Sequence, residues 1–263
     1  MENYYYPLSQ VHPITRWEGN HLEKQAILNA DALIYASDWA ARSAIEDYGA
    51  NSDKINIIPF GANIDDVPAR ETLSDGSTDG RLRLLFVGQD WERKGGQIAF
   101  DALLALLGRG IDTELTVIGC TPGGNLAHPS LRVIPNLDKN LPAQRAALAE
   151  FYRGSDIFLL PTRAECSGIV FCEAGAYGLP IISTQTGGVP TVVVEGTNGF
   201  LLPHDADGKV YAERLAALWG NRAAYLRMRQ SSRDRYETVL NWTAWAAKVR
   251  QLIEQLAMRH SIR

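Results

Sequence analysis

The sequence contains few cysteines, and they are not arranged for a metal site. Cys120, Cys166 and Cys172 stand singly among 263 residues, whereas structural zinc sites use ligands paired at short spacing. An odd and sparse set of cysteines suits a reducing compartment better than a disulfide framework. We therefore expect a cytoplasmic protein.

Long apolar runs and an excess of positive charge are also missing. No run approaches the ~18 apolar residues of a membrane helix, and residues 1–13 lack the charged-then-apolar pattern of a signal peptide. The formal net charge is -4, whereas proteins that bind duplex nucleic acid usually present a basic face. We expect no transmembrane segment and no nucleic-acid partner, although a local basic patch could still bind a small anion.

The sequence does contain a regular alternation of apolar runs and helical stretches after residue 80, and 46% of its residues are hydrophobic. Strands are predicted at 84–87, 115–118, 131–134, 157–160 and 181–183, and helices at 97–107, 142–152 and 168–177. Strand, helix and strand with short links imply a parallel sheet, because the helix carries the chain back to the end of the sheet at which the first strand began. The predicted fold is α/β, with a Rossmann-like doubly wound parallel sheet.

The polar, glycine-rich stretch Ser74–Gly80 marks a boundary between packed units. Before it, helices at 17–30 and 39–48 and strands at 32–35 and 54–59 form α/β material too short for a complete domain. The predicted division is an incomplete N-terminal remnant at 1–72, a linker at 73–80, a Rossmann-like domain at 81–221 and C-terminal helices at 222–263.

Ligands of open parallel sheets bind at the carboxyl ends of strands, which directs attention to the loop after the first strand of the domain. This loop runs from Gly88 to Gly96 and places Arg93 and Lys94 beside flexible glycines at a helix start. Cations and free amides in such a position suit a diphosphate. A charged, solvated helix start explains the same residues.

The loop after the strand at 157–160 contains Glu165 and Glu173, with seven residues between them. If the helix starts near Gly168, its first free amides can bind an anion, and Glu173 lies about 7.5 Å along the helix axis. The two carboxylates would then bracket a phosphate and accept hydrogen bonds from sugar hydroxyls on either side, as in a nucleotide sugar. The alternative is that Glu173 faces solvent and Glu165 caps the helix.

These elements occur in an order and spacing that resemble the C-terminal domain of family-4 GT-B glycosyltransferases, between about Glu23 and Trp245. The supporting segments are 23–37, Ile57–Asn63, Phe86–Gly88 with Lys94 and Gly95, Val117–Gly119, the glutamate pair, and Thr186–Pro190. The resemblance implies a retaining glycosyltransferase that uses no metal or other cofactor and transfers a glycosyl group from a nucleotide-diphosphate sugar to an acceptor hydroxyl. It also implies that residues 1–72 are the end of the acceptor-binding domain.

The resemblance further implies roles for individual residues. Arg93 and Lys94 would hold the diphosphate, Glu165 the hydroxyls of the donor sugar, and Glu173 the ribose. The donor would also be bound by a set of glycines and loop residues, with Gly119 and Asn136 beside the base: Gly88, Gly119, Asn136, Ser167, Gly168, Ile169, Val170, Gly187 and Gly188. Two residues depart from the family pattern: Gln89 replaces an arginine, and Ser167 replaces a bulky aromatic residue.

Two other features have simpler or competing interpretations. The pair Asp205 and Asp207 resembles a manganese-binding motif, but it follows a strand and precedes Gly208, which predicts a turn.

The short N-terminal remnant predicts either a truncated enzyme that lacks most of its acceptor domain, or a nucleotide-sugar-binding subunit or pseudoenzyme that needs a partner chain. A nucleotide-sugar epimerase would need further acids and histidines in the cleft. The donor base, the sugar and the acceptor are not specified by these residues.

Overall fold

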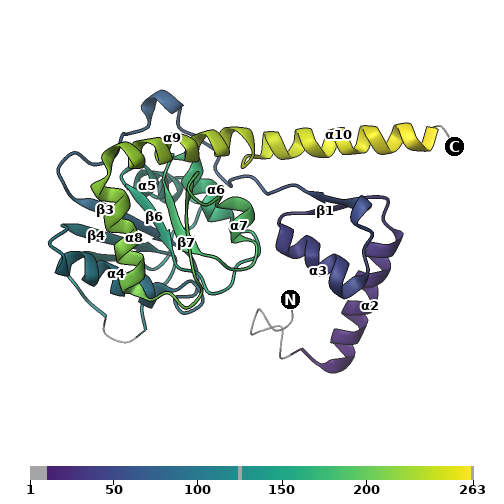
Figure 1. Ribbon diagram of the computed structural model, residues 1–263, viewed down its shortest axis with the longest axis horizontal. Coiled ribbons are helices and arrows are strands. Elements are labelled where there is room, and N and C mark those ends of the chain that lie inside the picture. Colours follow the sequence, from purple (N-terminus) through teal and green to yellow (C-terminus); the bar gives the residue numbers. More distant parts are fainter. Residues whose placement is uncertain (1–10, 124–125, 262–263) are drawn as a thin grey trace.

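The computed structural model describes residues 11–123 and 126–261. Residues 1–10 of the predicted N-terminal remnant and residues 262–263 of the predicted C-terminal helices lie outside this range. The described chain forms a large unit built on a six-stranded sheet and a small N-terminal unit with a two-stranded sheet (Figure 1).

The large sheet is parallel throughout, and its strands are arranged in the order β5-β4-β3-β6-β7-β8. These strands are β3 (Leu82–Val87), β4 (Thr113–Ile118), β5 (Leu131–Ile134), β6 (Ile157–Leu160), β7 (Ile181–Thr184) and β8 (Gly199–Leu202). The chain first adds strands on one side of β3 and then returns to add strands on the other side. This order confirms the predicted Rossmann-like doubly wound fold and places its switch point between β3 and β6.

Helices cover both faces of the sheet. The helices of the large unit are α4 (Gly96–Gly108), α5 (Pro142–Arg153), α6 (Ile169–Ala176), α7 (Val189–Val192), α8 (Gly208–Gly220) and α9 (Arg222–Thr238). They are followed by α10 (Trp242–Ser261), which extends away from the sheet (Figure 1). The crossovers through α4 and α6 travel in opposite directions along the sheet, so right-handed connections place these helices on opposite faces. Helix α8 packs beside α4, and α9 packs on α6. Every residue of β6 and β7 is buried, as expected for strands covered on both sides.

Helix α9 holds the carboxyl ends of two shorter helices through arginine side chains. Arg233 donates to the carbonyl of Ala176 at the end of α6, and Arg235 donates to Thr191 and Val192 at the end of α7, at 2.6 and 2.9 Å. Cations at a helix carboxyl end satisfy free carbonyls and interact favourably with the helix dipole. Helix α9 therefore fixes the position of α6, the helix that carries Glu173.

Residues 74–80 contain no helix or strand, yet they are fastened to the sheet by the buried Asp156. Its carboxylate accepts hydrogen bonds from the amide and the hydroxyl of Ser77, each at 2.7 Å, and from the amide of Arg83 at 2.8 Å. The stretch predicted as a linker thus has a defined path across the beginning of β3 and β6. The composition that predicted a linker could not reveal this anchor, because Asp156 follows 76 to 82 residues later in the sequence.

The N-terminal unit has very little core. It consists of α2 (Pro13–Asn29), β1 (Leu33–Tyr35), α3 (Asp38–Tyr48) and β2 (Ile55–Ile57), and β1 pairs with β2 in parallel. Only Ile27, Ala44 and Ala50 form its cluster of buried apolar residues among those described. Seven large apolar side chains are exposed on the same unit: Ile14, Trp17, Leu22, Leu28, Ile34, Ile45 and Ile57. A two-stranded sheet is marginal by itself, so little of the stability of this unit comes from its own core.

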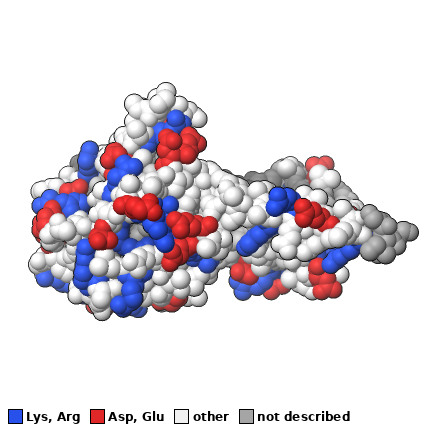
Figure 2. All heavy atoms as spheres, turned by 90° about the horizontal axis from the view of Figure 1, so that it is seen from above, with Lys and Arg blue, Asp and Glu red and all other residues white. Residues whose placement is uncertain are grey.

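Helix α10 leaves the large unit and extends past the N-terminal unit (Figure 1). None of the helices in the described ranges combines the length and the apolar content that a membrane span requires. Viewed from above, the described atoms show basic and acidic side chains interspersed over the large unit (Figure 2).

Candidate functional site

The loops that follow β3 and β6 meet at the switch point of the sheet. Gly95, at the start of α4, has a φ of 76°, and a Cβ atom placed there would lie 2.0 Å from the carbonyl oxygen of Pro161. The carbonyl of Arg93 accepts a hydrogen bond of 2.7 Å from the amide of Arg163. The backbone approach therefore requires glycine at position 95, and it brings the two predicted site loops into direct contact.

Arg93 reinforces this contact with its side chain. Its guanidinium donates to the carbonyl of Ala164 at 3.1 Å and forms an ion pair of 3.3 Å with Asp90. Asp90 itself has a φ of 73°, an uncommon conformation for a residue other than glycine. Arg93 was predicted to hold a diphosphate, and in this structure it joins the two loops at the edge of that site.

Lys94 and Glu165, predicted from separate loops, form a buried ion pair. Their side chains are only 10% and 11% exposed, and a Cβ atom at Gly88 would contact the stem of Lys94 at 3.1 Å. Removing either partner from such a pair leaves a buried charge without compensation. Glu165 also accepts a hydrogen bond from the amide of Cys166.

Helix α6 begins directly after this pair and presents free amides. Gly168 occupies the N-cap position with a φ of 66°, and no side chain caps the helix. The amides of Ser167, Gly168, Ile169 and Val170 have no acceptor among the described residues, whereas the next amide, that of Phe171, donates to Gly168. The alternative in which Glu165 caps the helix is therefore wrong, and the first turn is open to an anion.

Glu173 lies on α6 and is buried, with 1% of its surface exposed. One carboxylate oxygen accepts from Lys139 at 2.6 Å, and the other accepts from the hydroxyl of Tyr152 at 2.9 Å. The alternative in which Glu173 faces solvent is therefore wrong. A carboxylate this deeply buried needs such partners, because its desolvation would otherwise be costly.

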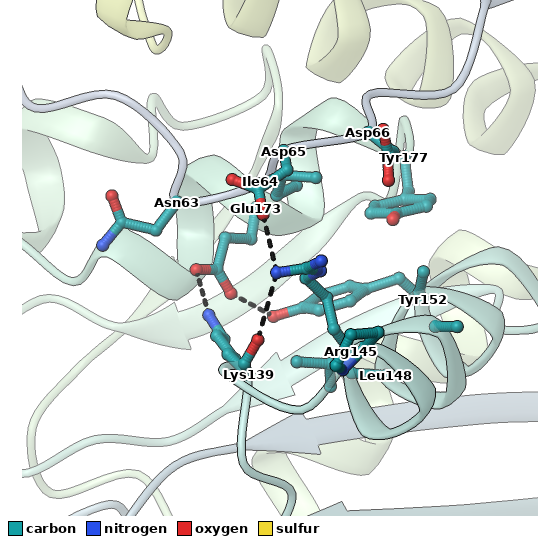
Figure 3. Close-up of a pocket in the computed structure, with 13 residues that line it drawn as sticks. Asn63, Ile64, Asp65, Asp66, Lys139, Arg145, Leu148, Tyr152, Glu173 and Tyr177 are labelled. Carbon is teal, nitrogen blue, oxygen red and sulfur yellow. Dashed lines mark hydrogen bonds and ion pairs between the residues drawn. The ribbon is translucent and has the colours of Figure 1, made fainter.

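A pocket of about 190 Å³ lies beside Glu173, between α5 and the segment that leaves the N-terminal unit (Figure 3). Arg145 of α5 crosses this pocket to form an ion pair of 2.9 Å with Asp65. The pocket thus borders both α6, through Glu173, and the connection between the two units.

The remaining predicted residues lie at different distances from the two site loops. Gly119 follows β4 with a φ of 98° and faces the backbone of Gly88, whose oxygen would lie 3.0 Å from an added Cβ. Gly188 donates to the carbonyl of Glu165 at 2.9 Å and packs against Cys166 and the buried Ser37 of the N-terminal unit. Gly187, with a φ of 49°, precedes it in the same loop. Asn136 is exposed beyond β5 and forms no hydrogen bond with the other predicted site residues.

Other polar groups near the site have structural explanations. Asp205 lies in a turn, and Asp207 caps α8 by accepting from the amides of Lys209 and Val210. Burial raises the pKa of the Cys120 thiol to about 11 and that of the Cys172 thiol to about 12. These two thiols are therefore protonated at neutral pH and are poor nucleophiles.

Sequence reasoning missed Lys139 and Tyr152, the two partners of Glu173. Lys139 is a loop lysine without any motif around it. Tyr152 is the last residue on the apolar face of the predicted helix at 142–152. Helical periodicity predicts that Tyr152 is buried, but it carries no information on which acceptor its hydroxyl meets.

Comparison with known proteins connects this geometry to an enzyme family. The family model described as glycosyl transferases group 1 matches residues 81–221, more than half of the chain. A D-inositol 3-phosphate glycosyltransferase of Corynebacterium efficiens is 31% identical over 249 residues, which cover 88% of this chain and 57% of that protein. The chain therefore spans little more than half the length of this relative.

Solved structures show the same fold at lower identity. A glycosyltransferase from Rickettsia africae superposes with a TM-score of 0.71 at 16% identity, covering 90% of this chain and 67% of that one. Anabaena Alr3699/HepE, solved in complex with UDP and glucose, superposes with a TM-score of 0.65 at 16% identity, covering 87% and 64% of the two chains. The matched architecture is that of GT-B glycosyltransferases.

The contact of Gly95 with Pro161 predicts a large difference between Gly95, the N-cap residue of α4, and Gly108, the last residue of that helix. Gly95→Ala should lower the free energy of unfolding by at least about 2 kcal/mol, because alanine is strained at positive φ and its Cβ would clash with a backbone oxygen. Gly108→Ala, at the other end of α4 in open space, should be neutral or stabilising by about 0.5 kcal/mol. Urea unfolding of both variants measures the difference. Equal stabilities would contradict the close approach of the two loops.

Proposed function

Because the chain belongs to the glycosyl transferases group 1 family, we propose that it binds a nucleotide-diphosphate sugar at the switch point between β3 and β6. The proposed reaction is retaining, metal-independent transfer of the glycosyl group to an acceptor hydroxyl. The observation that carries this proposal is the open first turn of α6, which lies between the carboxylates of Glu165 and Glu173. Such a site offers amides to a diphosphate and acceptors to the hydroxyl groups on either side of it.

In the proposed complex, the diphosphate lies against the amides of residues 167–170, with Arg93 and Lys94 as its cations. Glu165 accepts from the donor sugar and Glu173 from the ribose, while Gly119 and Asn136 flank the base. Lys94 must then share its charge between Glu165 and the diphosphate, since the two side chains are already paired. This pairing supports a role for Lys94 in both interactions, because it contacts the carboxylate proposed to bind the sugar and is itself proposed to bind the diphosphate.

The protein's contribution to transfer is to hold the donor and to stabilise negative charge on the leaving diphosphate. The dipole and free amides of α6 favour an anion without any proton transfer, and Lys94 adds a positive charge at the same edge. In the proposed mechanism the leaving diphosphate assists deprotonation of the acceptor hydroxyl. The acceptor therefore attacks the anomeric carbon from the same face of the sugar as the diphosphate leaves. Asp207 is committed to capping α8, which favours the metal-independent interpretation over a manganese site at Asp205 and Asp207.

We assign residues 1–72 to the end of an acceptor-binding half, 73–80 to a linker, 81–221 to the donor-binding domain and 222–263 to the C-terminal helices. The small buried cluster and the exposed apolar residues of the N-terminal unit support this division. They are equally expected of a nucleotide-sugar-binding subunit whose acceptor half is a separate chain, and we retain that as the second candidate.

Donor binding should not require a divalent metal. We expect the chain to bind a nucleoside diphosphate or its sugar conjugate in buffer with excess chelator, because amides, Arg93 and Lys94 supply the positive charge. Isothermal titration with UDP, GDP and ADP, with and without manganese, tests this. Binding that occurs only with manganese would refute the metal-free proposal and return attention to Asp205 and Asp207.

The two glutamates should affect different parts of the donor. Glu173→Gln should weaken binding of the free nucleoside diphosphate by about 10- to 100-fold, the effect of losing a hydrogen bond to a charged group. Glu165→Gln should mainly reduce the additional affinity that the sugar provides. Titrating both variants with the diphosphate and with the nucleotide sugar separates the effects, and Glu46→Gln, on an exposed face of α3, is the control. An unchanged diphosphate affinity in Glu173→Gln would disprove the ribose assignment.

The 263 residues alone should transfer little sugar. Holding an acceptor hydroxyl against the donor can account for ~7–11 kcal/mol of barrier reduction, and the N-terminal unit offers only one edge of an acceptor site. We expect slow donor hydrolysis from the chain alone and faster transfer after fusion to an acceptor-binding half. Product analysis over a panel of donors and acceptors measures both reactions. Efficient transfer by the unfused chain would show that residues 1–72 form a working acceptor site.

A further inference from the structure

The two oxygens of the Glu173 carboxylate have partners of different character (Figure 3). Oε2 accepts a hydrogen bond of 2.9 Å from the Tyr152 hydroxyl, and Oε1 accepts one of 2.6 Å from the Lys139 ammonium. The Glu173 side chain is 2% exposed, whereas the Lys139 side chain is 41% exposed. One partner is therefore enclosed with the carboxylate, and the other reaches it from the surface.

Tyr152 is held firmly in place. It lies in the last turn of α5, is 2% exposed, and its ring stacks between those of Tyr177 and Phe158, with centroids 5.1 and 6.2 Å away. Burial and the neighbouring charge of Glu173 raise the pKa of Tyr152 well above its usual value. The hydroxyl therefore keeps its proton and remains a hydrogen-bond donor. A rotation that broke this bond would require both neighbouring rings to move.

Lys139 has no such enclosure. It lies in the turn after β5, and its long side chain can exchange the carboxylate for water at small cost, since ammonium groups are strongly hydrated. A ligand hydroxyl cannot reach a carboxylate that is 98% enclosed unless one covering group moves. Of its two hydrogen-bonding partners, only Lys139 is placed to do so.

We propose that Tyr152 is a positioning residue for the nucleotide: it fixes Oε2 of Glu173 while the ribose hydroxyls replace Lys139 at Oε1. This inference rests on the proposed function, because it takes the ligand of Glu173 to be a ribose. Tyr152 does not contact the donor; it sets the direction in which Glu173 presents its free oxygen. Without the hydroxyl, the carboxylate loses a buried partner and can turn toward the pocket beside Arg145.

The chain provides a matched control for this proposal. Tyr152→Phe and Tyr177→Phe make the same chemical change in two stacked, buried rings. The Tyr177 hydroxyl forms no hydrogen bond with any described residue, so its removal leaves Glu173 with both partners. A purely structural effect of removing a hydroxyl from this stacked pair of rings should appear in both variants, whereas a positioning effect should appear only at Tyr152.

The experiment titrates the wild type and both variants with three probes in chelator: UDP, its 2′,3′-dideoxy analogue and inorganic pyrophosphate. We expect Tyr152→Phe to weaken UDP binding about tenfold or more and to change the affinities for the dideoxy analogue and pyrophosphate less than about twofold. Tyr177→Phe should leave all three affinities unchanged. ADP and GDP with their dideoxy analogues replace UDP if the wild type prefers another base.

Each remaining result has a distinct meaning. A wild type that binds no nucleoside diphosphate would refute the proposed function and this inference with it. A wild type that binds UDP, with equal losses for UDP and the dideoxy analogue in Tyr152→Phe, would overturn the positioning role alone. If Tyr152→Phe fails to fold, a crystal structure of the wild type with UDP decides: the proposal requires Tyr152 on Oε2 and Lys139 displaced, and a Lys139 still bound to Glu173 would overturn it.

Discussion

The close approach of the loops after β3 and β6 is the constraint on which the candidate site depends. The strand order reverses between these two strands. The loops that follow them are therefore far apart in the sequence but adjacent in space. Gly95 allows one loop to rest on the backbone of Pro161, and the Arg93 side chain ties the same loop to Ala164. Lys94 and Glu165 can pair only because of this contact. The free first turn of α6 follows immediately, so cation, carboxylate and amides share one edge of the sheet.

The electrostatics of the site follow from burial. The side chains of Glu165 and Glu173 are only 11% and 2% exposed, and each is paired with a lysine, Lys94 and Lys139 respectively. Much of the positive charge near α6 is thus already balanced by carboxylates in this structure. The amides at the start of α6 are the groups that remain free to attract an anion. In the proposed complex, the donor would have to compete with Glu165 and Glu173 for the two lysines. In the proposed complex, such competition would link binding of the diphosphate to release of the carboxylates that are proposed to bind the sugar and the ribose.

The two units of the chain differ in the extent of their buried cores. The large unit has a continuous buried core, with arginines of α9 holding the ends of α6 and α7. Among the described residues, the buried apolar cluster of the N-terminal unit contains only Ile27, Ala44 and Ala50, and its sheet has two strands. It nevertheless contacts the site, because Ser37 packs under Gly188 and the amide of Asp38 donates to Thr191. This contact therefore positions the N-terminal unit relative to the candidate site.

The sequence by itself determined the alternation of strands and helices from β3 to β7, the doubly wound class of the sheet and the loops of the candidate site, but not the bounds of α7 and β8. These features depend on local periodicity and on the handedness of crossovers, which act over short stretches of chain. The glutamate pair and the glycines at 88, 95, 119 and 168 were recognisable for the same reason. Only the tertiary structure decided the partners of each charge: Lys94 with Glu165, Lys139 and Tyr152 with Glu173, and Asp156 with Ser77. These contacts join residues 21 to 79 positions apart, and they depend on side-chain packing that no local pattern encodes.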